Sequence, residues 1–220
     1  MTNEVSAIEP EPAAEVIAAR LQQSARGGTE RLLQWLQELG RLDRELYAAI
    51  ANVPTPTLDE PVRRLSNSAN YSLIWLSAAG VVAIVGGRRG RKAALAGVLA
   101  IGITSAVVNQ GIKRLYPRAR PDRAGQQVPL ERHVRMPGST SFPSGHSASG
   151  FAFATAVGAF APVLGAPLRF IAAAVAYSRV HTGVHYPGDA VIGSLLGASI
   201  GGLVAAVARR WLAGPPRGPG

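Results

Sequence analysis

The sequence predicts an all-α integral membrane protein, a helical bundle of about five transmembrane helices preceded by an amphipathic N-terminal helix. Of the 220 residues, 47% are apolar and only 16% are charged, and the mean hydropathy is +0.15. Five apolar segments follow a polar N-terminal region. Backbone inside a bilayer must satisfy its own hydrogen bonds, and these segments are too long and too little alternating for barrel strands.

The two ends of the chain are expected to be flexible tails. Residues 1–28 open with polar, acidic sequence that includes Glu9-Pro10-Glu11-Pro12, a composition that disfavours a packed structure. Residues 213–220 are rich in Pro and Gly. No cleavable signal peptide is expected, because residues 1–12 lack an apolar core.

Residues 29–70 are predicted to form an amphipathic, interfacial region. Apolar residues recur there at roughly helical spacing: Leu32, Leu36, Leu39, Leu46 and Ile50. This predicts a helix from Thr29, as the N-cap, to the residue before Pro54. A short helix over 59–67 should lead into the membrane. The first helix is expected to pack on the bundle or lie in the interface, with partner binding as the alternative.

Residues 71–212 are predicted to form the membrane domain. Its apolar segments are 71–87, 93–112, 147–164, 168–177 and 190–212. The fourth is short for a span, unless it is tilted or extended towards Arg179. Gly193, Gly197 and Gly201 repeat every four residues in the last segment, so helices can approach it closely.

The basic charge of the chain is attributed to lipid and phosphate contacts. A net charge of +10 is compatible with nucleic-acid binding, but the basic residues stand at the ends of apolar runs and aromatic residues are only 6%. We therefore expect the lipid bilayer as a partner and no nucleic acid. The chain has no cysteine, which excludes disulfides and thiolate metal sites.

If the second to fifth segments all cross the membrane, two polar stretches emerge on the same side. These are the loop 113–146 and the turn 178–189. At the loop's start, Lys113 and Arg120 can converge if the helix continues to Leu115 and the chain bends at Pro117. The alternative is that these are snorkelling cations at a membrane boundary.

The end of the loop and the turn carry two histidines. Ser144 is suited to cap the third apolar helix, leaving backbone N–H groups near Gly145 that can face an anion. The alternative is an ordinary cap with an incidental His146. His185 and Asp189 are four residues apart, where Pro187 can start a helix, so the carboxylate can fix the imidazole tautomer. The alternative there is a turn whose charges suit the helix dipoles.

Together these residues are typical of an oxyanion cage. Fixed positive charge comes from Lys113, Arg120 and Arg179, and neutral donors come from Ser144 and the Gly145 amide. His146 and His185 would face one phosphoryl group, as a proton donor and a nucleophile on opposite sides.

Three short patterns resemble the signature of the type 2 phosphatidic acid phosphatase superfamily. They are Lys113 followed after six residues by Arg120-Pro121, then Pro143-Ser144-Gly145-His146, then Ser178-Arg179 with five residues to His185 and three more to Asp189. Every signature position is matched in order and spacing, over about residues 71–212. One departure is that many relatives have six spans, whereas here an amphipathic helix stands where a first span is expected.

The resemblance implies a metal-independent phosphatase that hydrolyses a phosphate monoester or diphosphate of a membrane lipid through a phosphohistidine intermediate. It implies that His185 attacks phosphorus, Asp189 orients it and His146 protonates the leaving group. The implied phosphate ligands are Lys113, Arg120, Ser144, Gly145 and Arg179. No cofactor and no metal are implied.

Two other functions stay open at this point. The same cage could hold vanadate, as in the related haloperoxidases, although those are soluble enzymes. A non-catalytic lipid-binding or transport protein would need the cations but not a positioned nucleophile and acid. Several lipid phosphates fit the site, including phosphatidic acid and polyprenyl phosphates or diphosphates.

The location of the site and the oligomeric state are further expectations. The loop 88–92 and the Arg209-Arg210 end are basic and suit the cytoplasm. The active site of this multi-pass cell-membrane protein would then be extracytoplasmic. A homo-oligomer is possible in the absence of a sixth span.

Overall fold

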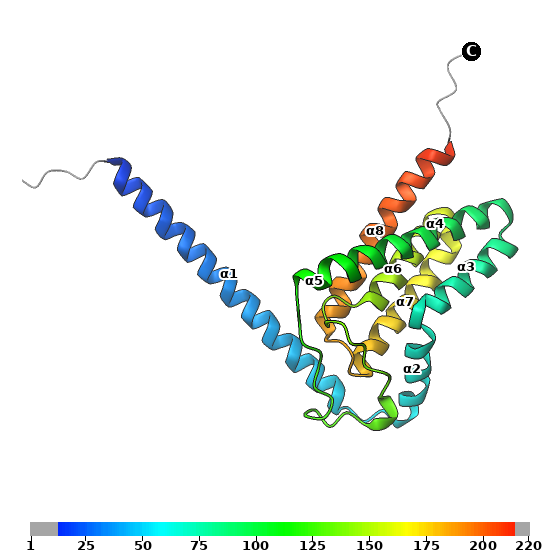
Figure 1. The fold of residues 1–220 in the computed structure, drawn as a ribbon, viewed down its shortest axis with the longest axis horizontal. Helices are drawn as coiled ribbons and strands as arrows, with labels where there is room; N and C mark the ends of the chain where they lie inside the picture. The colour runs from blue at the N-terminus through cyan, green and yellow to red at the C-terminus, as the bar shows by residue number, and fades with distance from the viewer. Residues whose placement is uncertain (1–12, 214–220) are drawn as a thin grey trace, which may run out of the picture. The chain divides into compact units, whose positions relative to one another are not determined.

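The computed structural model describes residues 13–213, with side chains over 28–211. All of its regular elements are helices, and no strand occurs within 13–213 (Figure 1). The all-α prediction is therefore confirmed. Of the expected tails, 1–28 and 213–220, residues 1–12 and 214–220 lie outside the described residues, whereas 13–28 and 213 are helical. The chain divides into two units, residues 1–42 and 43–220, which are described separately.

The N-terminal unit consists of the first part of α1, a 40-residue helix over Ala13–Asn52. The predicted start at Thr29 is wrong, since the helix runs continuously through that residue. Residues 13–26 are mostly Ala, Glu, Arg, Gln and Leu, which favour helix, and the Gly pair that follows costs only about 1 kcal/mol per residue. Leu32, Leu36 and Leu39 are each more than half exposed on this helix.

Two short helices lead from α1 to the bundle. α2 (Pro56–Ser68) begins three residues before the predicted start, because Pro56 occupies the first helical turn and Asp59 accepts a hydrogen bond from Thr55 Oγ1 at 2.7 Å. One turn of 3-10 helix, η1 (Asn70–Ser72), then joins α2 to α3 (Leu73–Val85). α2 and α3 are bent by 64° across this turn.

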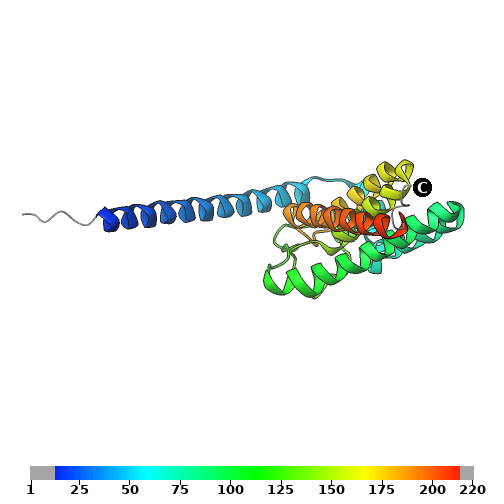
Figure 2. The ribbon, with the colours of Figure 1, turned by 90° about the horizontal axis from the view of Figure 1, so that it is seen from above.

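α3 and the helices that follow it form the membrane bundle. Those that follow are α4 (Gly87–Ser105), a π-helical segment η2 (Ala106–Ile112), α5 (Lys113–Leu115), α6 (Gly145–Phe160), α7 (Pro162–His181) and α8 (Pro187–Ala213). A single 3-10 turn, η3 (Leu130–Arg132), lies in the long loop. Figure 2 shows that this loop emerges at the α5 end of the bundle.

α6 is the central helix of the bundle and packs on α4, α7 and α8. Its Ala148, Ala152 and Ala156 are fully buried. A Cβ added to Gly197 of α8 would lie 2.0 Å from the Ala148 carbonyl oxygen, and one added to Gly201 would lie 2.4 Å from that of Ala152. The glycine repeat is therefore required for the backbones of α6 and α8 to touch.

Three helices within residues 13–213 are long and apolar enough to cross a membrane: Gly87–Leu115, Pro162–His181 and Pro187–Trp211. A fourth span arises if the bent pair α2–α3 counts as one. The fourth predicted segment, which looked short, is a full 20-residue helix because it begins at Pro162 and extends to His181. α6 has only 16 residues, fewer than the ~20 needed to cross the hydrocarbon.

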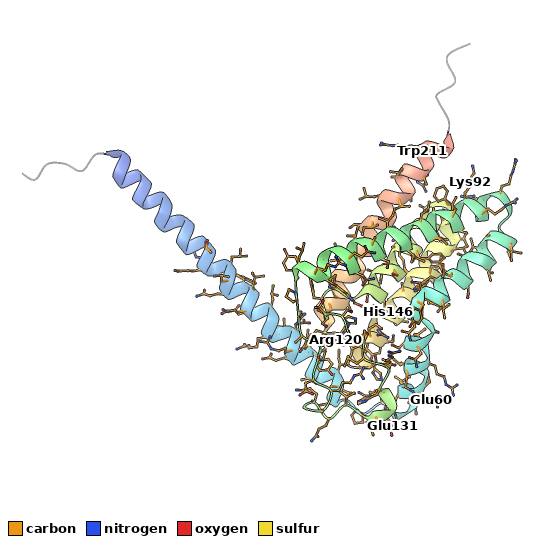
Figure 3. All side chains as sticks on the ribbon, viewed as in Figure 1. Glu60, Lys92, Arg120, Glu131, His146 and Trp211 are labelled. Carbon is orange, nitrogen blue, oxygen red and sulfur yellow. The ribbon has the colours of Figure 1, made fainter. Side chains whose placement is uncertain are left out.

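Figure 3 shows Lys92 and Trp211 towards one end of the bundle and Arg120 and His146 towards the other. At the first end, Arg89 Nε donates to the Phe160 carbonyl at 2.5 Å, and Arg209 donates to that of Ala159. The basic α3–α4 turn and the end of α8 therefore meet at the α6–α7 turn.

Candidate active site

A cavity of about 290 Å³ opens at the end of the bundle that carries the long loop. Five of the sequence-predicted residues line it: Lys113, Arg120, Gly145, His146 and His185. The loop 113–146 and the turn 178–189 thus meet at one end of the bundle. The other three predicted residues, Ser144, Arg179 and Asp189, are buried beside residues that line the cavity.

The two cations of the loop converge on one serine. The helix that begins at Gly87 continues through the π segment to Leu115, and the chain then turns away at Tyr116. Lys113 Nζ donates to Ser139 Oγ at 3.2 Å, and Arg120 Nη2 donates to the same oxygen at 3.2 Å. π-helical turns often occur at functional sites, and this one also places Asn109 at the cavity wall.

Backbone carbonyls fix the direction of Arg120. Its Nε donates to the Ser139 carbonyl at 2.9 Å, and its Nη1 donates to the Val184 carbonyl at 2.8 Å. Nη1 is also 3.4 Å from His185 Nε2. Burial lowers the pKa of Arg120, although Asp189 acts in the opposite direction. The guanidinium remains charged at neutral pH and lies beside the imidazole nitrogen that faces the cavity.

Ser144 begins α6 as predicted. Its Oγ accepts hydrogen bonds from the Ser147 N–H at 3.4 Å and from Ser147 Oγ at 2.9 Å. Its own N–H donates to the Asp189 carbonyl at 2.9 Å, which ties the start of α6 to the start of α8. The first residue of the helix, Gly145, lies at the cavity wall, where N-terminal N–H groups favour an anion.

A strained turn holds His146. Its Nε2 is 3.1 Å from Asn70 Oδ1, and Asn70 lies in the turn between α2 and α3. Tyr71 and Ser72, which follow, have φ angles of 53° and 58° and line the cavity. Left-handed backbone at a non-glycine residue costs of order 1 kcal/mol or more, and such strain is concentrated at functional sites.

Arg179 is buried at the end of α7, with 1% of its surface exposed. Its Nη1 donates to Ser66 Oγ at 2.6 Å. Its Nε is buried without a hydrogen-bond partner among the described residues. An unsatisfied buried donor of a charged group is costly, so it marks a position where an anion would be stabilised. Its carbonyl accepts from the N–H groups of Val184 and His185 at 3.0 and 3.1 Å, which folds the turn back onto α7.

His185 lies in this turn and is almost completely buried. Burial lowers its pKa to about 4; the interaction with Asp189 raises the pKa, while Arg120 and Arg179 lower it further. The imidazole is therefore neutral at neutral pH and keeps a free lone pair. Because Nδ1 faces Ser141 and Asp189, the nitrogen available for attack is Nε2.

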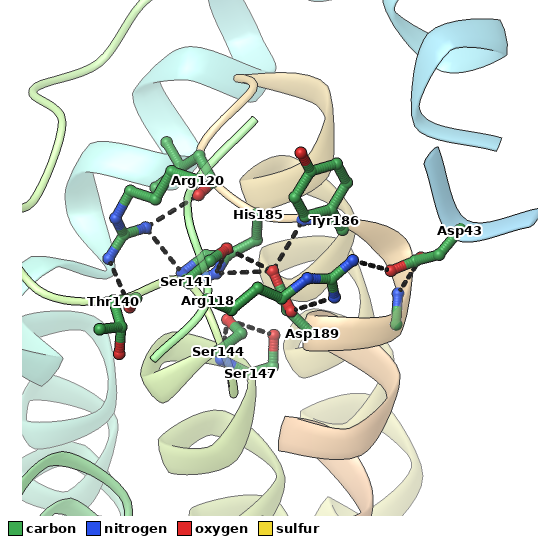
Figure 4. Close-up of polar contacts among 12 residues, drawn as sticks. Asp43, Arg118, Arg120, Thr140, Ser141, Ser144, Ser147, His185, Tyr186 and Asp189 are labelled. Carbon is green, nitrogen blue, oxygen red and sulfur yellow. Dashed lines mark hydrogen bonds and ion pairs between the residues drawn. The ribbon is translucent and has the colours of Figure 1, made fainter. Parts of the chain in front are cut away.

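Asp189 lies in the first turn of α8, which Pro187 begins as predicted. Figure 4 shows its carboxylate among several donors. Oδ2 accepts from Ser141 Oγ and from the Tyr186 N–H at 2.9 Å, and it is 3.5 Å from His185 Nδ1. Oδ1 accepts from Arg118 Nη1 at 2.7 Å. The orientation of the carboxylate towards His185 is therefore set by neighbours outside the signature.

Sequence reasoning missed three polar neighbours of the catalytic candidates, Asn70, Arg118 and Ser141, and the carboxylate that holds Arg118, Asp43. Two of them had a local signal, since Arg118 precedes Arg120 by two residues and Ser141 precedes Ser144 by three. Asp43 and Asn70 had none, because each is more than 70 residues from its partner.

Comparison with known proteins places these residues in a family context. The sequence pattern of the PAP2 superfamily matches residues 93–212. Decaprenylphosphoryl-5-phosphoribose phosphatase of Mycobacterium tuberculosis is 35% identical over 173 residues, which cover 76% of this chain and 93% of that protein. The enzyme of the same name from Mycolicibacterium smegmatis is 37% identical over 137 residues, which cover 60% of this chain and 68% of that protein.

Two solved proteins have similar structures. Aquifex aeolicus LpxE has a TM-score of 0.61 and 26% identity, over 75% of this chain and 95% of that one. A transmembrane PAP2-type phosphatidylglycerolphosphate phosphatase from Bacillus subtilis also has a TM-score of 0.61, with 22% identity. This match covers 83% of this chain and 90% of that one. The second likeness concerns the fold alone.

Proposed function

Because the chain belongs to the PAP2 superfamily and is a membrane lipid phosphatase, we propose that His185, Asp189 and His146 are its catalytic residues. We propose further that the substrate is a polyprenylphosphoryl sugar phosphate. The observation that carries the substrate proposal is the similarity to the mycobacterial decaprenylphosphoryl-5-phosphoribose phosphatase, which extends over 93% of that protein's length. A haloperoxidase or a transport role is not favoured by these relatives.

The proposed reaction has two steps. In the first, His185 Nε2 attacks phosphorus, the P–O bond to the sugar breaks, and His146 gives its proton to the departing oxygen. In the second, water attacks the phosphohistidine, His146 takes a proton from that water, and the P–N bond breaks. Asn70 Oδ1 accepts from His146 Nε2–H, so the proton that is transferred is the one on Nδ1, and His146 enters the first step as an imidazolium. Burial lowers the pKa of His146 to about 3, and Arg179 acts in the same direction. The negative charge of the bound phosphoryl group is therefore required to favour the imidazolium.

Fixed cations stabilise the charge of the transferred phosphoryl group in this proposal. Lys113 and Arg120 approach from the loop, and Arg179 presents its unsatisfied Nε from α7. Asp189 balances the positive charge that develops on His185. Since protein cations supply this stabilisation, the rate is not expected to depend on an added metal.

Phosphate release across a substrate panel tests the substrate and the metal independence together. The purified protein in detergent is assayed with a decaprenylphosphoryl-5-phosphoribose, phosphatidylglycerol phosphate, phosphatidic acid and a polyprenyl diphosphate. We expect the highest kcat/KM for the first, with the rate unchanged by EDTA. A preference for a glycerol-based lipid would contradict the substrate proposal. An activity that EDTA removes and a divalent metal restores would contradict the chemistry.

We also propose that the site faces the extracytoplasmic side of the cell membrane. Support comes from the basic residues gathered at the opposite end, where Arg88, Arg91 and Lys92 surround one surface hollow and Arg209 reaches the α6–α7 turn. A cysteine placed at Gln126, in the exposed loop, should react with an impermeant reagent in intact cells. If this cysteine is protected in intact cells and reacts only after lysis, the site faces the cytoplasm and the proposal is contradicted.

A further inference from the structure

Arg118 lies between two carboxylates from distant parts of the chain. Its Nη1 donates to Asp189 Oδ1 at 2.7 Å, and its Nη2 donates to Asp43 Oδ2 at 2.8 Å. The guanidinium also stacks over the Tyr186 ring, 4.2 Å from the centroid. Burial alone would lower the pKa of Arg118, but Asp189 and Asp43 outweigh it and raise the pKa. The side chain is thus fixed on three sides.

The second carboxylate belongs to the C-terminal part of α1. Asp43 and Tyr47 are four residues apart and share one face of the helix. Asp43 Oδ1 accepts from the Gly188 N–H at 2.6 Å, at the start of α8. The Tyr47 ring packs edge-on against Tyr186, with centroids 5.5 Å apart. This face therefore contacts two residues within the His185–Asp189 turn, Tyr186 and Gly188.

We propose that Arg118 and Asp43 are positioning residues of the phosphatase, which set the orientation of Asp189 and so of the His185 nucleophile. The inference rests on the proposed role of Asp189. Asp43 lies outside residues 93–212, which match the superfamily pattern. The pair therefore makes the C-terminal end of α1, from Asp43, a part of the catalytic centre of this chain.

The two carboxylate oxygens of Asp189 have different partners, and Arg118 holds the oxygen that faces away from His185. Oδ2 is shared among Ser141, the Tyr186 N–H and His185. Among the described residues, the donor to Oδ1 is Arg118. The carboxylate is fully buried, so losing this donor leaves an unbalanced charge that can rotate away from His185. The contact of Oδ2 with Nδ1, at 3.5 Å, is already long for a hydrogen bond.

A distortion at this point should lower kcat and leave KM nearly unchanged, because the phosphate ligands Lys113, Arg120 and Arg179 remain in place. Misplaced supporting residues typically cost about 10- to 100-fold. We expect Arg118→Gln to lower kcat by about 10-fold or more. Asp43→Asn keeps the shape and an acceptor for Gly188, and it should lower kcat by about threefold.

The test is a double-mutant cycle in the full-length enzyme, with phosphate release measured for Arg118→Gln and Asp43→Asn, each alone and combined with Asp189→Asn. Arg114→Gln and Glu38→Gln, at exposed positions of the same segment and helix, are the matched controls and should keep wild-type kcat. Because Arg118 acts through Asp189, adding Arg118→Gln to Asp189→Asn should lower kcat by less than about twofold further.

Each outcome decides the inference. Wild-type kcat for Arg118→Gln, full additivity with Asp189→Asn, or an equal loss in the controls would overturn it. If Arg118→Gln does not elute as a folded protein, Asp43→Asn carries the test, and wild-type kcat there would overturn it. If Asp189→Asn itself is fully active, the proposed role of Asp189 fails and the inference fails with it. If Asp189→Asn is inactive and Arg118→Gln has wild-type kcat, the inference is rejected and the proposed role of Asp189 stands.

Discussion

Replacing His185 by Ala is expected to abolish phosphate release, with a loss of at least about 10⁴-fold in kcat, because the variant has no nitrogen to form the phosphohistidine. The effect should be this large because the neighbours of His185 stabilise charge but cannot attack phosphorus. The measurement is steady-state phosphate release from the lipid substrate in detergent. Binding should survive, since the cations that line the cavity are unchanged.

His133→Ala is the matched control for this variant. His133 is half-buried in the same long loop, its Nε2 is 3.1 Å from the Val128 carbonyl, and it is not among the residues that line the cavity. Its removal should leave kcat within about threefold of wild type. Near-normal activity in His185→Ala, or an equal loss in His133→Ala, would show that the nucleophile lies elsewhere.

Replacing His146 by Ala is expected to cost about 100-fold or more in kcat with the lipid substrate, because the departing sugar alkoxide needs a proton. The loss should be much smaller with p-nitrophenyl phosphate, whose leaving group is stable as an anion. The quantity to compare is the ratio of wild-type to variant kcat for the two substrates. This ratio separates proton donation from a general disturbance of the cavity.

Asn70→Ala is the companion variant, since Asn70 holds His146 and does not itself line the cavity. It should show the same substrate dependence as His146→Ala, but to a smaller degree. Equal losses for both substrates in His146→Ala would contradict the role of general acid and would favour a role in phosphate binding instead.

Much of the fold follows from patterns that are local in the sequence. Long apolar segments must form helices in a bilayer, and Pro187 and Ser144 mark the starts of α8 and α6 as predicted. The glycine repeat predicted a close helix contact, and Gly197 touches the α6 backbone. The signature residues also lie in or beside one cavity, because the loop 113–146 and the turn 178–189 meet at the same end of the bundle.

The parts that sequence reasoning missed depend on contacts between distant segments. Asp43 and Arg118 are 75 residues apart, and Asn70 and His146 are 76 apart, with no periodicity that links them. The start of α1 was misplaced because Thr29 has the chemistry of a cap, although the residues before it favour helix equally well. α6 is short because its ends are set by Ser144 and the α6–α7 turn.

The most direct test of the central claim is to trap the phosphoryl-enzyme. The wild-type protein is mixed with lipid carrying ³²P in its terminal phosphate, quenched rapidly in alkali, and digested for peptide mapping. We predict label on the peptide that contains His185, stable in alkali and released in acid as a phosphohistidine should be, and absent from His185→Ala. Label on another residue, or a wild-type enzyme that turns over without any labelled intermediate, would contradict the proposal.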